Sequence, residues 1–203
     1  EDAAPAAQAI SKRQIDRLYV VGSNPVTAET IESSYRRFVA ILDRLIARQG
    51  YILGARPSAA DFAVFGQLTQ LALVEPTAAA VTSSISRRVR GWVDRMEDLS
   101  GLDPQTDEWL SREDLGPALN DLLGEIGRVY APFLIANAHA VMSGAPSFET
   151  MIDGRPWTQP SFPYQARCLQ WMREQYSALS PADRRAAAQI LAGTGCDALF
   201  ADV

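Results

Sequence analysis

The chain has few of the side chains on which most catalytic and metal sites depend. One of its 203 residues is histidine and two are cysteine. A general base needs a nucleophile or an orienting carboxylate beside it, and the sequence nominates neither for His139, which we interpret as a residue at a helix end. Cys168 and Cys196 form no CxxC motif and have no histidine nearby, which argues against a zinc site and a disulfide scaffold. We therefore predict no catalytic residue and no metal site.

The two thiols have structural interpretations. Cys168 falls on the apolar stripe of a predicted helix, where a small core residue is expected. Cys196 lies in a Gly-Thr-Gly-Cys turn, a place that allows exposure; we interpret it as a free structural thiol, and a reactive thiol is the alternative.

Positive charge is scarce and scattered. The chain carries 19 basic and 24 acidic residues, a net charge of −5, and Lys12 is its only lysine. Without a basic cluster, neither nucleic acid nor a membrane surface is an expected partner. The most apolar window, 62–74, is shorter than the roughly 20 residues that cross a bilayer, and Gln67 and Gln70 interrupt it. We expect a cytoplasmic protein.

The first ten residues, EDAAPAAQAI, have neither an initiator methionine nor the basic-then-apolar order of a signal peptide. We expect a processed end or the edge of a longer chain.

Apolar residues recur at helical spacing through most of the sequence, which predicts one helical domain over 1–203. One stripe begins after Thr27, a candidate N-cap, and ends at Gly50, which suits the left-handed position after a helix. From Phe62 to Val74 nearly every position is uncharged, so we expect a helix enclosed by others. Further helices are predicted at 84–97, from Pro117 through a kink at Pro132, at 164–179, and from Ser180 to Gly193.

The stretch from 147 to 165 breaks the helical rhythm. Asp153 and Gly154 suit a two-residue hairpin turn, and the prolines around them limit the strands to a short ribbon. The expected fold is therefore all-α, a bundle of six to eight helices with one irregular or hairpin insertion near 147–163.

The same region carries the best candidates for a small-molecule site, because polar groups and aromatic rings gather there on a loop. The favoured interpretation is instead that the aromatic residues anchor the loop and the amide side chains bond to its backbone, with a small-molecule site as the alternative. The candidate substrate-binding residues here are Arg155, Trp157, Gln159, Tyr164 and Gln165.

The motif GARPSAAD, 54–61, predicts a firmly capped helix. Ser58 is a favourable N-cap, and Asp61 can reach back to the free amide of Ser58, which satisfies two backbone donors of the first turn. Both are interpreted as structural capping residues.

The longer stretch GARPSAADFAVFGQL resembles the N-capping box and core helix in the C-terminal all-helical domain of cytosolic glutathione S-transferases. The flanking segments YIL, before Gly54, and RRVRGWVDRME, 87–97, are similar to their counterparts in the family. The resemblance is closest over 10–100. Residues 101–203 look like the C-terminal extension of some bacterial members, packed on that core.

The resemblance implies a helical domain that forms the apolar co-substrate wall of a transferase. Tyr35 would then border the cleft between domains, although its place on the apolar stripe is also explained by packing. Glutathione and the catalytic residue would belong to an N-terminal thioredoxin-like domain, for which this sequence has no βαβ pattern. No cofactor is therefore expected on this chain alone. The implied partners are a small apolar molecule, the missing N-terminal domain and, in a homodimer, a second copy.

Two other functions remain open from the sequence. One is a non-catalytic binding or scaffolding module that retains the helical fold, for which a closed surface is expected where the missing domain would dock. The other is a carrier of small apolar ligands with an enclosed pocket near 155–167.

Overall fold

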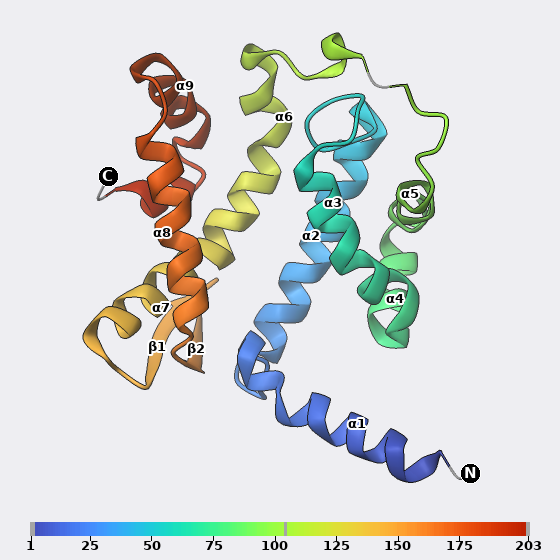
Figure 1. The fold of residues 1–203 in the computed structure, drawn as a ribbon, viewed down its shortest axis with the longest axis vertical. Coiled ribbons are helices and arrows are strands. Elements are labelled where there is room, and N and C mark those ends of the chain that lie inside the picture. Colours follow the sequence, from blue (N-terminus) through green and yellow to red (C-terminus); the bar gives the residue numbers. More distant parts are fainter. Residues whose placement is uncertain (1–2, 104, 202–203) are drawn as a thin grey trace.

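The computed structural model describes residues 3–103 and 105–201, and it confirms the predicted all-α class with one short hairpin (Figure 1). The helices are α1 (Ala4–Asp16), α2 (Ala28–Gln49), α3 (Ala59–Leu68), α4 (Pro76–Ile85), α5 (Arg87–Glu97), α6 (Arg112–Glu125), α7 (Ala131–Ser143), α8 (Pro163–Ser177) and α9 (Pro181–Leu191). The strands are β1 (Ser147–Ile152) and β2 (Arg155–Pro160). Short 3₁₀ turns lie at η1 (Leu18–Val21), η3 (Thr106–Glu108) and η5 (Cys196–Phe200), and π-helical turns at η2 (Thr69–Val74) and η4 (Ile126–Tyr130).

The core consists of two hydrophobic clusters, one in each half of the chain. In Figure 1, α2 to α5 form one half, while α6 to α9 and the hairpin form the other. The first cluster includes Val39, Leu42, Leu68, Val89 and Val93, and the second includes Leu134, Ile152, Trp157 and Leu169. Ile31 of α2 packs against the second cluster, so α2 serves both halves.

Asp61 fixes the start of α3 and the loop before it. Its side chain is fully buried. Oδ2 accepts hydrogen bonds from the backbone N–H of Ser58 at 2.8 Å and from its hydroxyl at 2.5 Å, while Oδ1 accepts one from Ile52 N–H at 2.8 Å. The Ser58 hydroxyl accepts in turn from Asp61 N–H, which completes the capping box. The two residues therefore have the structural position that the sequence predicts.

The expectation that 62–74 is enclosed by other helices is wrong. Only Asp61, Leu68 and Ala72 are buried along α3 and η2, whereas the Phe62 side chain is 51% and Val74 66% exposed. The physical reason is that α3 packs on one side only, against α5 and η2, and no described residue covers its outer side. An uncharged surface on every side of a helix thus did not mean burial on every side.

Two helix starts also differ from the prediction. Thr27 occupies the N-cap position of α2, but its hydroxyl donates to Gly22 C=O at 2.6 Å and does not cap the helix. Helix α6 begins at Arg112, with the Ser111 hydroxyl accepting from Asp114 N–H, so Pro117 lies inside the helix and does not start it. A capping serine followed by two acidic residues outweighed the preference of proline for a first turn.

The hairpin forms as predicted. β1 and β2 pair in antiparallel register from Ser147↔Pro160 to Ile152↔Arg155, with Asp153 and Gly154 in the turn. Asp153 has a φ of 52°, a left-handed conformation that Asp tolerates in such turns.

Cys196 is buried, which agrees with its interpretation as a structural thiol. Its side chain is 2% exposed and its thiol donates to Leu123 C=O at 3.1 Å. Burial raises the pKa of this thiol, which keeps it protonated and argues against the alternative of a reactive cysteine.

Two further observations concern metal ions and membranes. Across 3–103 and 105–201 no cluster of His, Cys, Asp and Glu has the geometry to hold a metal ion. Over the same residues, none of the helices combines the length and apolar character that a bilayer crossing needs.

Candidate small-molecule site between the two halves

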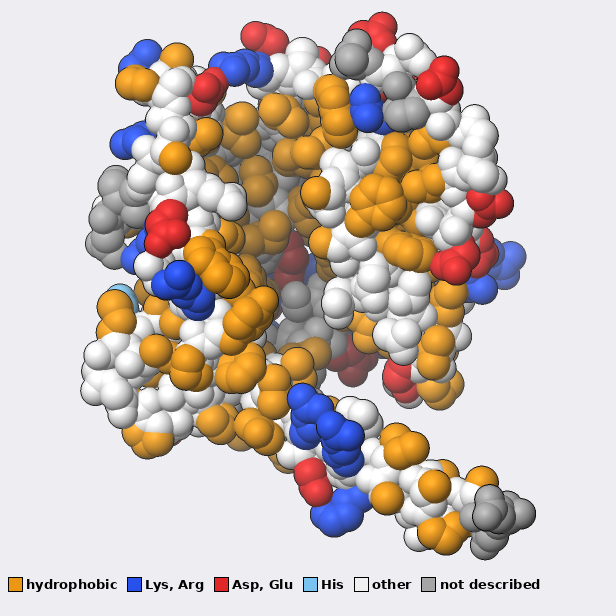
Figure 2. Space-filling view, viewed as in Figure 1, with side chains coloured by type: hydrophobic (Ala, Val, Ile, Leu, Met, Phe, Trp, Pro, Cys, Tyr) orange, Lys and Arg blue, Asp and Glu red, His pale blue; other side chains and the backbone are white. Residues whose placement is uncertain are grey.

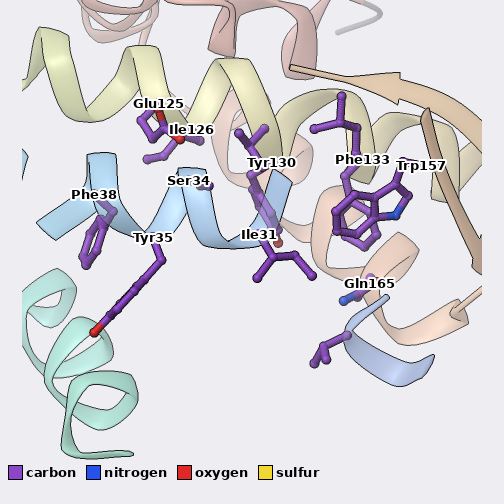
Figure 3. Close-up of a pocket in the computed structure, with 13 residues that line it drawn as sticks. Ile31, Ser34, Tyr35, Phe38, Glu125, Ile126, Tyr130, Phe133, Trp157 and Gln165 are labelled. Carbon is purple, nitrogen blue, oxygen red and sulfur yellow. The ribbon is translucent and has the colours of Figure 1, made fainter. Parts of the chain in front are cut away.

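The molecule is hollowed between its two halves, and hydrophobic side chains cover much of both walls (Figure 2). An apolar pocket of about 440 Å³ lies between α2, the α6–α7 helix and the hairpin. This volume is in the range of small-molecule sites. Its lining residues are Val21, Ile31, Ser34, Tyr35, Phe38, Glu125, Ile126, Val129, Tyr130, Phe133, Ile152, Trp157 and Gln165 (Figure 3).

Helix α2 supplies one wall through four residues at spacings of three and four, which lie on one helix face: Ile31, Ser34, Tyr35 and Phe38. The Tyr35 hydroxyl points away from the pocket toward α4 (Figure 3). It lies 2.6 Å from Thr82 Oγ1 and donates or accepts there, and it reaches Leu71 C=O at 3.3 Å. Burial raises the pKa of this phenol. Tyr35 therefore contributes its ring to the pocket while its hydroxyl ties α2 to α4 and η2.

The facing wall comes from the junction of α6 and α7. The long helix predicted through Pro132 contains the π turn η4, which lies between α6 and α7 just before that proline. Tyr130 in this turn is 40% exposed, and its hydroxyl has no hydrogen-bond partner among the described residues. Burial, and to a lesser degree Cys168, raise the pKa of Tyr130, so the hydroxyl remains a proton donor at neutral pH.

The hairpin closes the end of the pocket with Trp157. The indole packs edge-on against Phe133, with ring centroids 5.9 Å apart. Its N–H donates to Gln159 Oε1 at 3.2 Å, and the Gln159 amide donates to Val20 C=O at 3.0 Å. A Cβ at Gly22 would lie 2.6 Å from the Trp157 ring, so only glycine allows η1 to approach the hairpin this closely.

A group of charged residues holds the walls together behind the apolar lining. Arg37 of α2 forms a two-bond contact with Glu125, Nε to Oε2 at 2.7 Å and Nη2 to Oε1 at 2.9 Å. The same guanidinium lies 2.9 Å from Asp153 of the hairpin turn, and Arg128 lies within 3.7 Å of Asp153 as well. The Glu125 and Asp153 hydrogen bonds raise the pKa of Arg37, with that of Glu125 the larger cause. One arginine thus joins three elements of the pocket.

Three of the six predicted substrate-binding residues meet at this pocket: Tyr35, Trp157 and Gln165. Gln159 lies behind Trp157, with 2% of its side chain exposed. Arg155 pairs with Glu29 at 2.7 Å on the surface, and Tyr164 is 61% exposed against Trp171. These last three do not line the pocket, and the role of all six in substrate binding stays a prediction.

None of the predicted site residues lies on the α6–α7 wall. Ile126, Tyr130 and Phe133 recur at helical spacing, a pattern that is equally typical of residues facing a core. The signal that could have singled them out is Pro132 within that pattern, because a break in a helix often accompanies a functional site.

Comparison with known proteins gives a match for the first half of the chain, which contains the α2 wall of the pocket. Residues 9–95 match the family model described as glutathione S-transferase, C-terminal domain. No curated protein and no solved structure gives a significant match to the chain. The matched range contains α2, its pocket face and the capping box of α3. Residues 9–95 are therefore similar to the C-terminal domain of glutathione S-transferases.

Proposed function

We propose that this chain is the helical, co-substrate-binding part of a bacterial, cytoplasmic glutathione S-transferase-like protein, and that the pocket between its halves holds a small apolar molecule. The observation that carries the proposal is the pocket itself. One wall is α2 of the family-matched range, and the other is built by residues 125–165 outside it. The C-terminal half would thus complete the site rather than merely extend the fold.

In the intact protein, the reaction would be attack of the glutathione thiolate on an electrophilic carbon of the bound molecule, with the new carbon–sulfur bond forming as the leaving group departs. Glutathione and the group that activates its thiol would come from an N-terminal thioredoxin-like domain. We assign no catalytic residue to this chain.

The exposed apolar side of α3 and η2 favours this proposal over a self-contained scaffolding module. Phe62 and Val74 leave more than half of their side chains in water, and Leu73 beside them is 38% exposed. A module that works alone gains nothing from such a surface, whereas a docking domain or a second copy would cover it.

Titration with N-phenylnaphthylamine, a neutral fluorescent aromatic amine, tests the pocket. We expect its emission to rise on binding and to be excited by energy transfer from tryptophan, since Trp157 lines the pocket. Ser34→Phe, which fills the pocket from α2, should weaken binding at least about tenfold, a loss of about 1.4 kcal/mol. The matched control is Ser33→Phe, one position along and outside the pocket lining, which should leave the affinity unchanged.

Equal loss in both serine variants, or binding that neither affects, would place the ligand elsewhere. Calorimetric titration with reduced glutathione gives the complementary test. The chain alone should not bind glutathione tighter than roughly 1 mM, equivalent to about 4 kcal/mol, and tighter binding would contradict the assignment of the glutathione site to another domain.

A further inference from the structure

The lining of the pocket carries no charged group that lacks a partner. Glu125 is the one charged residue that lines it among those the structure describes, and both of its carboxylate oxygens accept from Arg37. Arg37 is shared with Asp153, and Asp153 also neighbours Arg128 and Arg155. The positive charges next to the pocket are therefore already paired with carboxylates.

An anionic ligand would find no counter-charge at this site. It would give up its hydration on entering an apolar space and would meet the carboxylate of Glu125 there. The net charge of −5 on the chain adds a repulsion at longer range. A cationic ligand gains little as well, because Glu125 has no oxygen left without a partner.

Uncharged hydrogen-bonding groups are present, by contrast. The Tyr130 hydroxyl has no partner within the described part of the chain, and the Gln165 Oε1 atom is buried without one. Both residues lie at the same end of the pocket, toward Trp157 (Figure 3). A buried amide oxygen without a partner is costly, so a ligand that lets this side chain turn and form a hydrogen bond is favoured.

We infer that the pocket selects neutral molecules that have an aromatic or aliphatic body and one uncharged hydrogen-bonding group, and that it discriminates against anions of the same shape. The body lies between α2 and the α6–α7 helix, and the polar group lies near Tyr130 and Gln165. This inference rests on the proposed function, since it names the class of ligand for the same pocket.

The experiment compares two probes that share a ring system and differ in one charge. N-phenylnaphthylamine is neutral, and anilinonaphthalene sulfonate adds a sulfonate to the same rings. We expect the wild-type chain to bind the neutral probe at least about tenfold more tightly at physiological ionic strength, with competition showing that both occupy one site. Tyr130→Phe should weaken a neutral phenol, such as naphthol, by about twofold to tenfold, the range for one hydrogen bond, and should leave naphthalene unaffected.

A charge placed in the pocket should invert the preference. Ser34→Lys sets a cation on the α2 wall, so the sulfonate should gain affinity relative to the neutral probe. Ser33→Lys, outside the lining, carries the same charge and controls for a general increase in anion binding; circular dichroism checks that both variants fold.

Failure of the proposed function and failure of the selectivity for neutral ligands give different results. Failure of both probes to bind wild type would contradict the proposed function and this inference with it. Binding of both probes, with the sulfonate equal or tighter, would retain the pocket and overturn the selectivity. An equal gain of sulfonate affinity in the two lysine variants would show that the charge acts from the surface, and would also overturn it.

Discussion

Replacing Asp61 by alanine is expected to lower the free energy of unfolding by about 3 to 5 kcal/mol, because two buried N–H groups and the Ser58 hydroxyl lose their acceptor. The two donors are those of Ser58 and Ile52, each 2.8 Å from a carboxylate oxygen. The carboxylate is fully buried, so both donors lie away from bulk water in the native protein. Urea denaturation followed by circular dichroism measures the loss.

The chain supplies a matched control for this change in Ser180 and Asp183, which cap α9 with the same spacing. There the Asp183 carboxylate is exposed on the surface and also pairs with Arg112. Asp183→Ala should therefore destabilise the protein far less than Asp61→Ala. Similar losses in the two variants would show that capping alone, and not the buried connection to Ile52, accounts for the effect.

Replacing Arg37 by alanine is expected to cost about 2 to 4 kcal/mol of stability, toward the lower part of the range for a broken ion pair because the arginine is partly exposed. Its removal leaves Glu125, 8% exposed, without its two hydrogen bonds to Arg37. Asp153 also loses its shortest ion pair, the one with Arg37. The hairpin should then hold the Trp157 end of the pocket less firmly. Thermal unfolding measures the stability, and the N-phenylnaphthylamine titration should show weaker binding.

Arg36 provides the control from the next position of α2. It pairs with Glu32 four residues away on the exposed face, a kind of pair that contributes about 0.3 to 0.5 kcal/mol. Arg36→Ala should change neither the midpoint of unfolding nor probe affinity appreciably. If Arg37→Ala proves equally mild, the charged group behind the pocket does not hold its walls together.

The sequence predicted the local features of the fold better than the contacts across it. The capping pair Ser58 and Asp61 and the Asp153–Gly154 turn each depend on a few neighbouring residues, and both formed as expected. The exposure of Phe62 could not be predicted, because it depends on which elements pack against α3.

In the pocket, too, residues with a local sequence signal were predicted, and residues placed by contacts across the fold were not. Trp157 and Gln165 were found because aromatic and amide groups in a loop are conspicuous, and Tyr35 followed from a family resemblance. Tyr130 and Phe133 were missed because a residue that faces a pocket and one that faces the core have the same helical spacing. Only the position of α2 opposite η4 distinguishes them, and that position depends on packing between distant segments.

Helix α1 has a consequence for dynamics. None of the residues of Ala4–Asp16 is buried, and the helix extends from the body beside η1 (Figure 1). A helix of thirteen residues with none buried is close to the lower limit for a stable helix in water. Its backbone amides should therefore exchange with solvent deuterium about as fast as those of a peptide, while those of α2 are protected by the core. Slower exchange in α1 would then report directly that another surface has come to cover it.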